Sequence, residues 1–238
     1  MKKELDYFEI AGEYGGDQDW LTDPWMKLGG CGACTACDIS IFLARYRGIE
    51  GLCPFDASKE ISKKDYIRFT RIMKPYLRPR WSGIKTLEMY TEGFEEYLSD
   101  SGVRDLRFER VSGTLDWRSA ALKLADFMDE EEQPVSMLVL NHNNPKMEDY
   151  VWQWFILNGY QAGSEKTPWY RRDGKRSVPD EFQVKAVTYG DYQWVPLREL
   201  WETGFEETGG LVFLHGAKAK AARRQKKSVW DTLNSPAE

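Results

Sequence analysis

The spacing of hydrophobic positions divides the chain into a helical first half and a strand-rich second half. Residues 31–47 contain no proline and no glycine beyond Gly32, and their small and apolar residues recur at helical spacing. The glycine pair before this run marks where a helix begins. Three further stretches carry apolar residues at the same period, and we predict helices over 63–76, 84–98 and 118–128.

Strand patterns begin at residue 106 and dominate after Pro134. We predict buried or alternating strands over residues 106–111, 135–141, 150–160, 183–189, 192–195 and 211–214. A short strand over 7–11 and a short helix over 196–203 complete the elements, whereas residues 15–20 and 23–25 are predicted to be loop. Helices first and an antiparallel sheet second is an α+β order.

Composition fits one globular domain. The chain of 238 residues is 42% hydrophobic and 30% charged, which suffices for a buried core without disulfides. We assign residues 1–215 to this domain and 216–238 to a basic C-terminal tail, which contains six basic and two acidic residues. The net charge of −5 implies no general affinity for nucleic acid or an anionic membrane.

Cysteine usage and hydropathy indicate the compartment. Three of the four cysteines lie within seven residues, which does not resemble a secreted disulfide framework. The first residues lack the apolar run of a signal peptide, and the apolar stretches elsewhere are too short to span a bilayer. We therefore expect a cytoplasmic protein with no membrane partner.

The segment Gly30-Cys31-Gly32-Ala33-Cys34 resembles the start of the central helix in the papain-like cysteine peptidases. The likeness is greatest to the bacterial branch that cleaves double-glycine leaders, the bacteriocin-processing type. The resemblance implies a papain-like fold with Cys31 as nucleophile, because a helix amino terminus lowers the pKa of a thiol. Gln18, thirteen residues upstream, resembles the glutamine that helps form the oxyanion hole.

The second half follows the superfamily's order of strands as well. Residues 153–160, QWFILNGY, resemble the strand that begins with the catalytic histidine, and residues 188–190 resemble the segment after the asparagine that orients it. Two residues depart from the pattern, because Gln153 stands at the histidine position and Val187 at the asparagine position. Glutamine has no titratable proton and cannot act as a general base.

The two histidines are the candidates to restore such a base. His142 lies in the turn between two predicted strands and leads towards Gln153, so it is a candidate, although a solvated turn histidine is the simpler interpretation. His215 follows the last predicted strand and is interpreted as structural.

The cysteines allow a rival interpretation. Cys31, Cys34 and Cys37, with the more distant Cys53, resemble an iron–sulfur or zinc ligand set. Three ligands on one continuous helix would fan out over ~120° and climb ~9 Å instead of converging. Buried packing is the commoner role for Cys34 and Cys37, so we expect no metal and no cofactor.

Three functional hypotheses follow from the sequence. The first is a degenerate or atypical thiol hydrolase of peptide or amide bonds, with Cys31, Gln18, Gln153 and His142 as its candidate residues. The second is a non-catalytic module that binds a peptide or protein in the same cleft. The third, more remote, is a metal or iron–sulfur protein. Whether the site is active and how the chain assembles are left open by the sequence.

Overall fold

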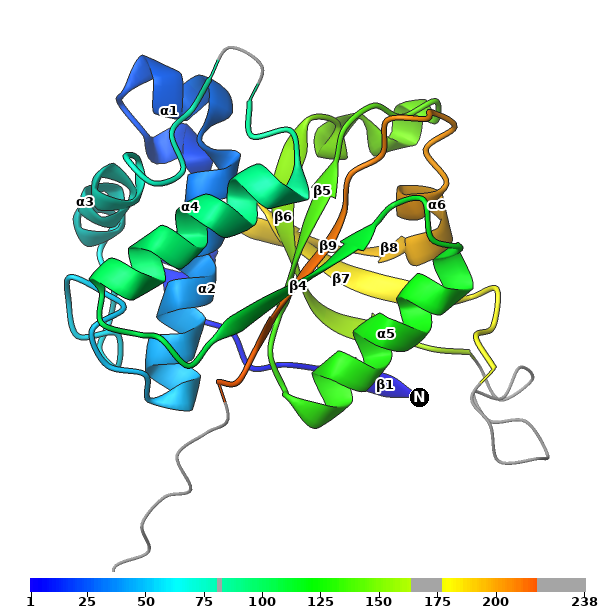
Figure 1. Ribbon diagram of the computed structural model, residues 1–238, viewed down its shortest axis with the longest axis horizontal. Helices are drawn as coiled ribbons and strands as arrows, with labels where there is room; N and C mark the ends of the chain where they lie inside the picture. Colours follow the sequence, from blue (N-terminus) through cyan, green and yellow to red (C-terminus); the bar gives the residue numbers. More distant parts are fainter. Residues whose placement is uncertain (81–82, 164–176, 218–238) are drawn as a thin grey trace, which may run out of the picture.

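The computed structural model describes residues 1–80, 83–163 and 177–217, which form helices around an antiparallel sheet (Figure 1). The strand order is β4-β9-β5-β6-β7-β8, and β1 pairs with β6 outside this path. Each pairing in it is antiparallel. The strands of this sheet are β1 (Lys2–Glu4), β4 (Arg107–Ser112), β5 (Val135–Val139), β6 (Gln153–Gln161), β7 (Gln183–Thr188), β8 (Asp191–Pro196) and β9 (Gly210–His215).

Helices cover both faces of the sheet (Figure 1). Helices α2 (Cys31–Arg47), α3 (Lys63–Met73) and α4 (Leu87–Asp100) contribute to one hydrophobic cluster. Helices α5 (Trp117–Glu130) and α6 (Leu197–Trp201) contribute to a second cluster on the other face. Among the described residues, no helix is long and apolar enough to cross a membrane.

The central strands are buried on both faces, which explains their nearly unbroken apolar sequence. On β6, Trp154 and Ile156 join the cluster of α2, whereas Phe155 and Leu157 join the cluster of α5. Successive side chains of a strand point to opposite faces, so a strand between two helical layers is apolar at nearly every position. This arrangement brings the start of β6 against α2.

Side-chain caps fix where several helices begin. Ser62 Oγ, Thr86 Oγ1 and the Asp116 carboxylate each accept a backbone N–H from the first turn that follows. The helix predicted over 84–98 therefore begins only after the Thr86 cap. Residues 23–25, predicted as loop, are instead the cap and first residues of α1 (Pro24–Gly29). Asp followed by Pro was the signal for that helix.

Three further expectations need correction. Gln18–Trp20 forms the 3₁₀ helix η1 instead of loop. Residues 150–152 are not strand, because the 3₁₀ helix η2 (Pro145–Tyr150) precedes β6. The strand predicted over 7–11 reduces to β2 (Glu9–Ile10), which pairs with β3 (Glu13–Tyr14), and β1 was not predicted.

The hairpin of β7 and β8 turns one residue earlier than predicted. Tyr189 and Gly190 occupy the turn, with φ angles of 51° and 69°. Two successive positive φ angles match the right-handed twist of the flanking strands, and glycine adopts them without steric cost. The turn orients Thr188 and Tyr189 towards the amino end of α2, where both line a small cavity with Cys31.

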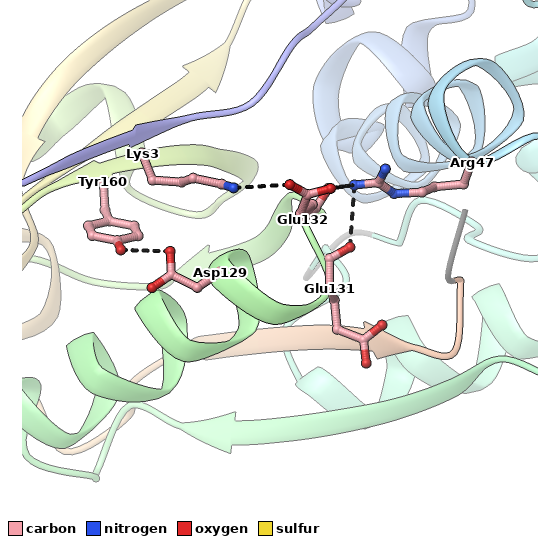
Figure 2. Close-up of polar contacts among 6 residues, drawn as sticks. All are labelled: Lys3, Arg47, Asp129, Glu131, Glu132 and Tyr160. Carbon is pink, nitrogen blue, oxygen red and sulfur yellow. Dashed lines mark hydrogen bonds and ion pairs between the residues drawn. The ribbon is translucent and has the colours of Figure 1, made fainter. Parts of the chain in front are cut away.

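Polar contacts fasten the far end of α2 to the turn after α5 (Figure 2). Arg47 Nη2 donates to the backbone carbonyls of Glu131, at 3.3 Å, and of Glu132. The Glu132 carboxylate also pairs with Lys3 of β1 at 3.3 Å. Tyr160 of β6 donates to Asp129 at 2.8 Å beside this group. The helix is thus held at its carboxyl end while its amino end faces the cavities described below.

Ala217, which follows the last strand, is buried in the cluster of α2. The rest of the expected basic tail, residues 218–238, lies outside the described residues.

Candidate functional site

The sequence around Gly30 fixes the amino end of α2. Helix α1 ends at Gly29, and Gly30 caps α2 with its carbonyl accepting from Cys34 N at 2.9 Å. A Cβ at Gly30 would lie only 2.3 Å from Met26 O, so this close approach requires glycine. Cys31 is consequently the first residue of α2, and it is 8% exposed.

The Cys31 thiol lies against a strained backbone segment. Its Sγ is 4.0 Å from the carbonyl oxygen of Trp152, which can accept the S–H hydrogen. Trp152 has a φ of 55°, a left-handed conformation that is rare for a bulky residue. Its N–H donates to Leu140 O at 2.8 Å, which helps to hold that conformation. Strain of this kind concentrates at functional sites, which makes the segment notable.

Gln153, the first residue of β6, lines a small cavity of about 20 Å³ together with Cys31. The glutamine is 6% exposed and lies in a neutral hydrogen-bond network. Its Nε2 donates to Thr188 Oγ1 at 3.1 Å, and its Oε1 accepts from Tyr189 Oη at 3.4 Å. The residue that stands at the histidine position of the resemblance is therefore beside the thiol, with only uncharged partners.

Gln18 lines the same small cavity from η1. Its Nε2 donates to Lys27 O at 2.8 Å, which fixes the amide. Its Oε1 is buried and has no hydrogen-bond partner within the part of the chain that the structure describes. The amide thus presents an acceptor that no neighbouring group satisfies. An oxyanion would need a donor instead.

Burial raises the pKa of the Cys31 thiol above its ordinary value. Backbone N–H groups of Trp154, Gly32 and Cys31 itself act in the opposite direction, but they do not outweigh desolvation. No cationic side chain contributes to this balance. Cys31 is therefore mainly a neutral thiol at neutral pH.

Asp38 is a buried carboxylate two turns along α2 that lines the small cavity. It accepts hydrogen bonds from Tyr7 Oη at 3.1 Å, Gly16 N at 3.1 Å and Tyr66 Oη at 2.8 Å. Burial nevertheless raises its pKa from 3.8 to about 6. The carboxylate ties the loop that leads into Gln18 to α2, so it positions one wall of the site.

A second cavity of about 510 Å³ opens on another side of Cys31. Its lining is mostly apolar and includes Trp25 and Leu28 of α1, which are 49% and 73% exposed. Ile84 lines it as well, and so does Trp152, which is 47% exposed. Exposed aromatic and aliphatic side chains around a cavity are a common feature of ligand sites.

His142 lines neither of the cavities that contain Cys31. Its Nδ1 accepts from Asn144 N at 2.9 Å, so Nε2 carries the proton and donates to Glu199 O at 2.6 Å. Both ring nitrogens are therefore engaged in holding the turn before β6 against α6. His215 of β9 contacts Glu109 of β4 at 3.1 Å, likewise away from these cavities.

The three clustered cysteines all lie on the continuous helix α2, and the fourth, Cys53, is also a free thiol. Over the described ranges, no group of three His, Cys, Asp or Glu side chains could hold a metal ion. Burial raises the pKa of Cys34 and Cys37 well above the ordinary thiol value. Cys37, which is 0% exposed and lines neither cavity beside Cys31, matches a packing residue, whereas Cys34 also lines the small cavity.

The structure brings Gln18, Cys31 and Gln153 to one cavity and leaves His142 outside it. Asp38 and Trp152 were not predicted as site residues. Asp38 is the one charged residue between Cys31 and Ala44, and a lone carboxylate in such a run was a signal for it. No sequence pattern around Trp152 indicated its left-handed backbone. Comparison of the chain with models of protein families, with curated proteins and with solved structures gives no match.

Proposed function

We propose that this protein is a papain-like module that binds a peptide segment in the cleft beside Cys31 without hydrolysing it. The order of the elements supports this assignment, because a helix that begins at a cysteine faces the first residue of a central strand. In the papain-like peptidases those two positions hold the nucleophile and the base.

The observation that carries the proposal is the neutral surroundings of the Cys31 sulfur. Gln153 occupies the position of the base and exchanges hydrogen bonds only with Thr188 and Tyr189. Peptide hydrolysis by a thiol needs a group that removes the S–H proton and later protonates the leaving amine. An amide side chain does neither, and burial keeps the pKa of the thiol raised.

The cavity of about 510 Å³ supplies the binding surface in this proposal. Its apolar walls suit a large aliphatic or aromatic side chain of the bound peptide, since burying such a side chain contributes about 1.5–3 kcal/mol. Arg80 also lines it and adds a cation at the rim. The occupant we favour is therefore a peptide with an apolar anchor residue.

A thiol hydrolase of peptide or amide bonds is the second candidate. It is favoured by the position of Cys31, which is the first residue of a long helix and lines the open cavity. This candidate requires a working base that reaches the thiol, and His142 is the histidine to test.

Alkylation kinetics separate the two candidates. The rate of Cys31 modification by iodoacetamide is measured against pH by mass spectrometry in wild type, Gln153→His and His142→Ala. We expect a slow wild-type rate that rises about tenfold per pH unit, because only the thiolate reacts. Gln153→His should accelerate it at neutral pH. A fast, pH-independent wild-type rate that collapses in His142→Ala would instead establish the hydrolase.

Binding is tested by selecting peptides from a random library on the purified protein. Affinities of selected peptides are then compared between wild type and Leu28→Asp, which places a charge in the cavity. Ile72→Asp on α3 is the matched control, because Ile72 is 38% exposed and does not line the cavity. Peptides that bind all three proteins equally would refute the assignment of the cleft.

A further inference from the structure

Cys31 and Cys34 form a pair of thiols at the amino end of α2. They occupy the first and fourth positions of the helix, and both are free. Each is 8% exposed, and both line the small cavity. Cys37 is also three residues from Cys34, but it is 0% exposed and lines neither cavity beside Cys31. The pair of Cys31 and Cys34 is therefore the more accessible of the two pairs.

Helical geometry places this pair within bonding range. A rise of ~1.5 Å per residue and a radius of ~2.3 Å put Cα atoms three residues apart at about 5 Å. A disulfide needs a Cα separation of about 4.4–6.8 Å. Closing the bond still requires a small adjustment of the side chains and the first turn.

We propose that Cys31 and Cys34 are a thiol–disulfide exchange site, which a low-molecular-weight disulfide such as glutathione disulfide converts reversibly to an internal disulfide. The inference concerns this pair of thiols and does not depend on peptide binding or on hydrolysis in the cleft.

Exposure to the larger cavity sets the order of the steps. Cys31 lines the cavity of about 510 Å³, whereas Cys34 does not. The Cys31 thiolate attacks one sulfur of glutathione disulfide, the disulfide bond breaks, and one glutathione thiolate leaves and takes a proton. Cys34, as thiolate, then attacks the Cys31 sulfur and expels the second glutathione. The protein loses two electrons and two protons, and glutathione disulfide becomes two thiols.

Gln18 provides an independent sign of a ligand at this position. The residue is 6% exposed and lines the small cavity, and its buried Oε1 has no hydrogen-bond partner among the described residues. The cavity of about 20 Å³ is too small for glutathione itself, so this oxygen marks a place for one small donor group beside the pair of thiols. Since unsatisfied buried acceptors are costly, a group that satisfies one is favoured there.

The experiment treats the full chain with defined ratios of reduced to oxidised glutathione and then blocks remaining thiols with iodoacetamide. Intact mass and tryptic peptides are read by mass spectrometry. We expect wild type to lose the mass of two hydrogen atoms, with both Cys31 and Cys34 protected from alkylation and dithiothreitol restoring them. The double variant Cys37→Ser, Cys53→Ser should behave identically, which excludes the other pairings.

The single variant Cys34→Ser should stop at a mixed disulfide between Cys31 and glutathione, because the resolving thiol is gone. Circular dichroism checks that each variant is folded. The wild-type measurement tests the proposal even if a variant does not fold. Wild type that retains all four thiols, that stops at the mixed disulfide, or that joins Cys37 to Cys53 would overturn the proposal.

Discussion

Replacing Asp38 by asparagine removes a buried charge whose effect on stability can be calculated from its surroundings. The carboxylate faces Tyr7, Tyr66 and the N–H of Gly16, and it shares the small cavity with Cys34. Asparagine retains one oxygen, which can accept from Tyr7 Oη and Gly16 N as Oδ2 of Asp38 does. Its amide nitrogen then donates to Tyr66 Oη, whose own proton can go to Cys34 O at 3.3 Å, so the hydrogen bonds are largely preserved. The main change is that the side chain no longer titrates.

The expected magnitude follows from the pKa of Asp38, which burial raises from 3.8 to about 6. At about 1.4 kcal/mol per pKa unit, the difference amounts to about 3 kcal/mol. Between these two pH values the folded state holds more protons than the unfolded state. The free energy of unfolding therefore falls as pH rises through this window, and the stability that protonated Asp38 provides is lost above about pH 6.

Urea denaturation at pH values from 4 to 7.5 measures this effect, with the free energy of unfolding compared between wild type and Asp38→Asn. We expect the wild-type value to fall relative to the variant by about 3 kcal/mol, mostly between pH 4 and 6.5. Glu95→Gln on α4 changes an exposed carboxylate and is the matched control. A difference between wild type and Asp38→Asn that does not change with pH would refute the reasoning.

Three further predictions test the packing around the site and its chemistry. Trp154→Ala should lower the free energy of unfolding in urea by about 3–5 kcal/mol, because Trp154 of β6 is 1% exposed and packs in the cluster of α2. An unchanged midpoint would contradict this packing. Gly16→Ala should lower the free energy of unfolding by about 1–3 kcal/mol in the same assay, since its Cβ would lie 1.9 Å from the Tyr66 side chain. Gly29→Ala, whose Cβ would lie 3.7 Å from its nearest neighbour, should leave the free energy of unfolding almost unchanged. Elemental analysis should find no stoichiometric zinc or iron, and one equivalent that disappears in Cys34→Ser would restore the metal interpretation.

The helices and most of the strands could be predicted from the sequence because their signals are local. The apolar period of α5 and the Asp116 cap lie within one segment, and so do the glycine pair and the helical run that define α2. The apolar sequence of β6 likewise indicated a strand buried on both sides. The predicted α+β class with an antiparallel sheet is confirmed. Errors occurred where a short element depends on a distant partner, as β1 depends on β6.

Only the tertiary structure decided what surrounds the Cys31 sulfur. The sequence placed Cys31 at a helix start and Gln153 at a strand start, but their shared cavity depends on how α2 packs against the sheet. The same packing left His142 bonded to the turn and to α6, and it gave Trp152 its left-handed backbone. Local periodicity reports which face of an element is buried. It does not report which distant group that face meets, because the contact arises from the summed packing of the whole core.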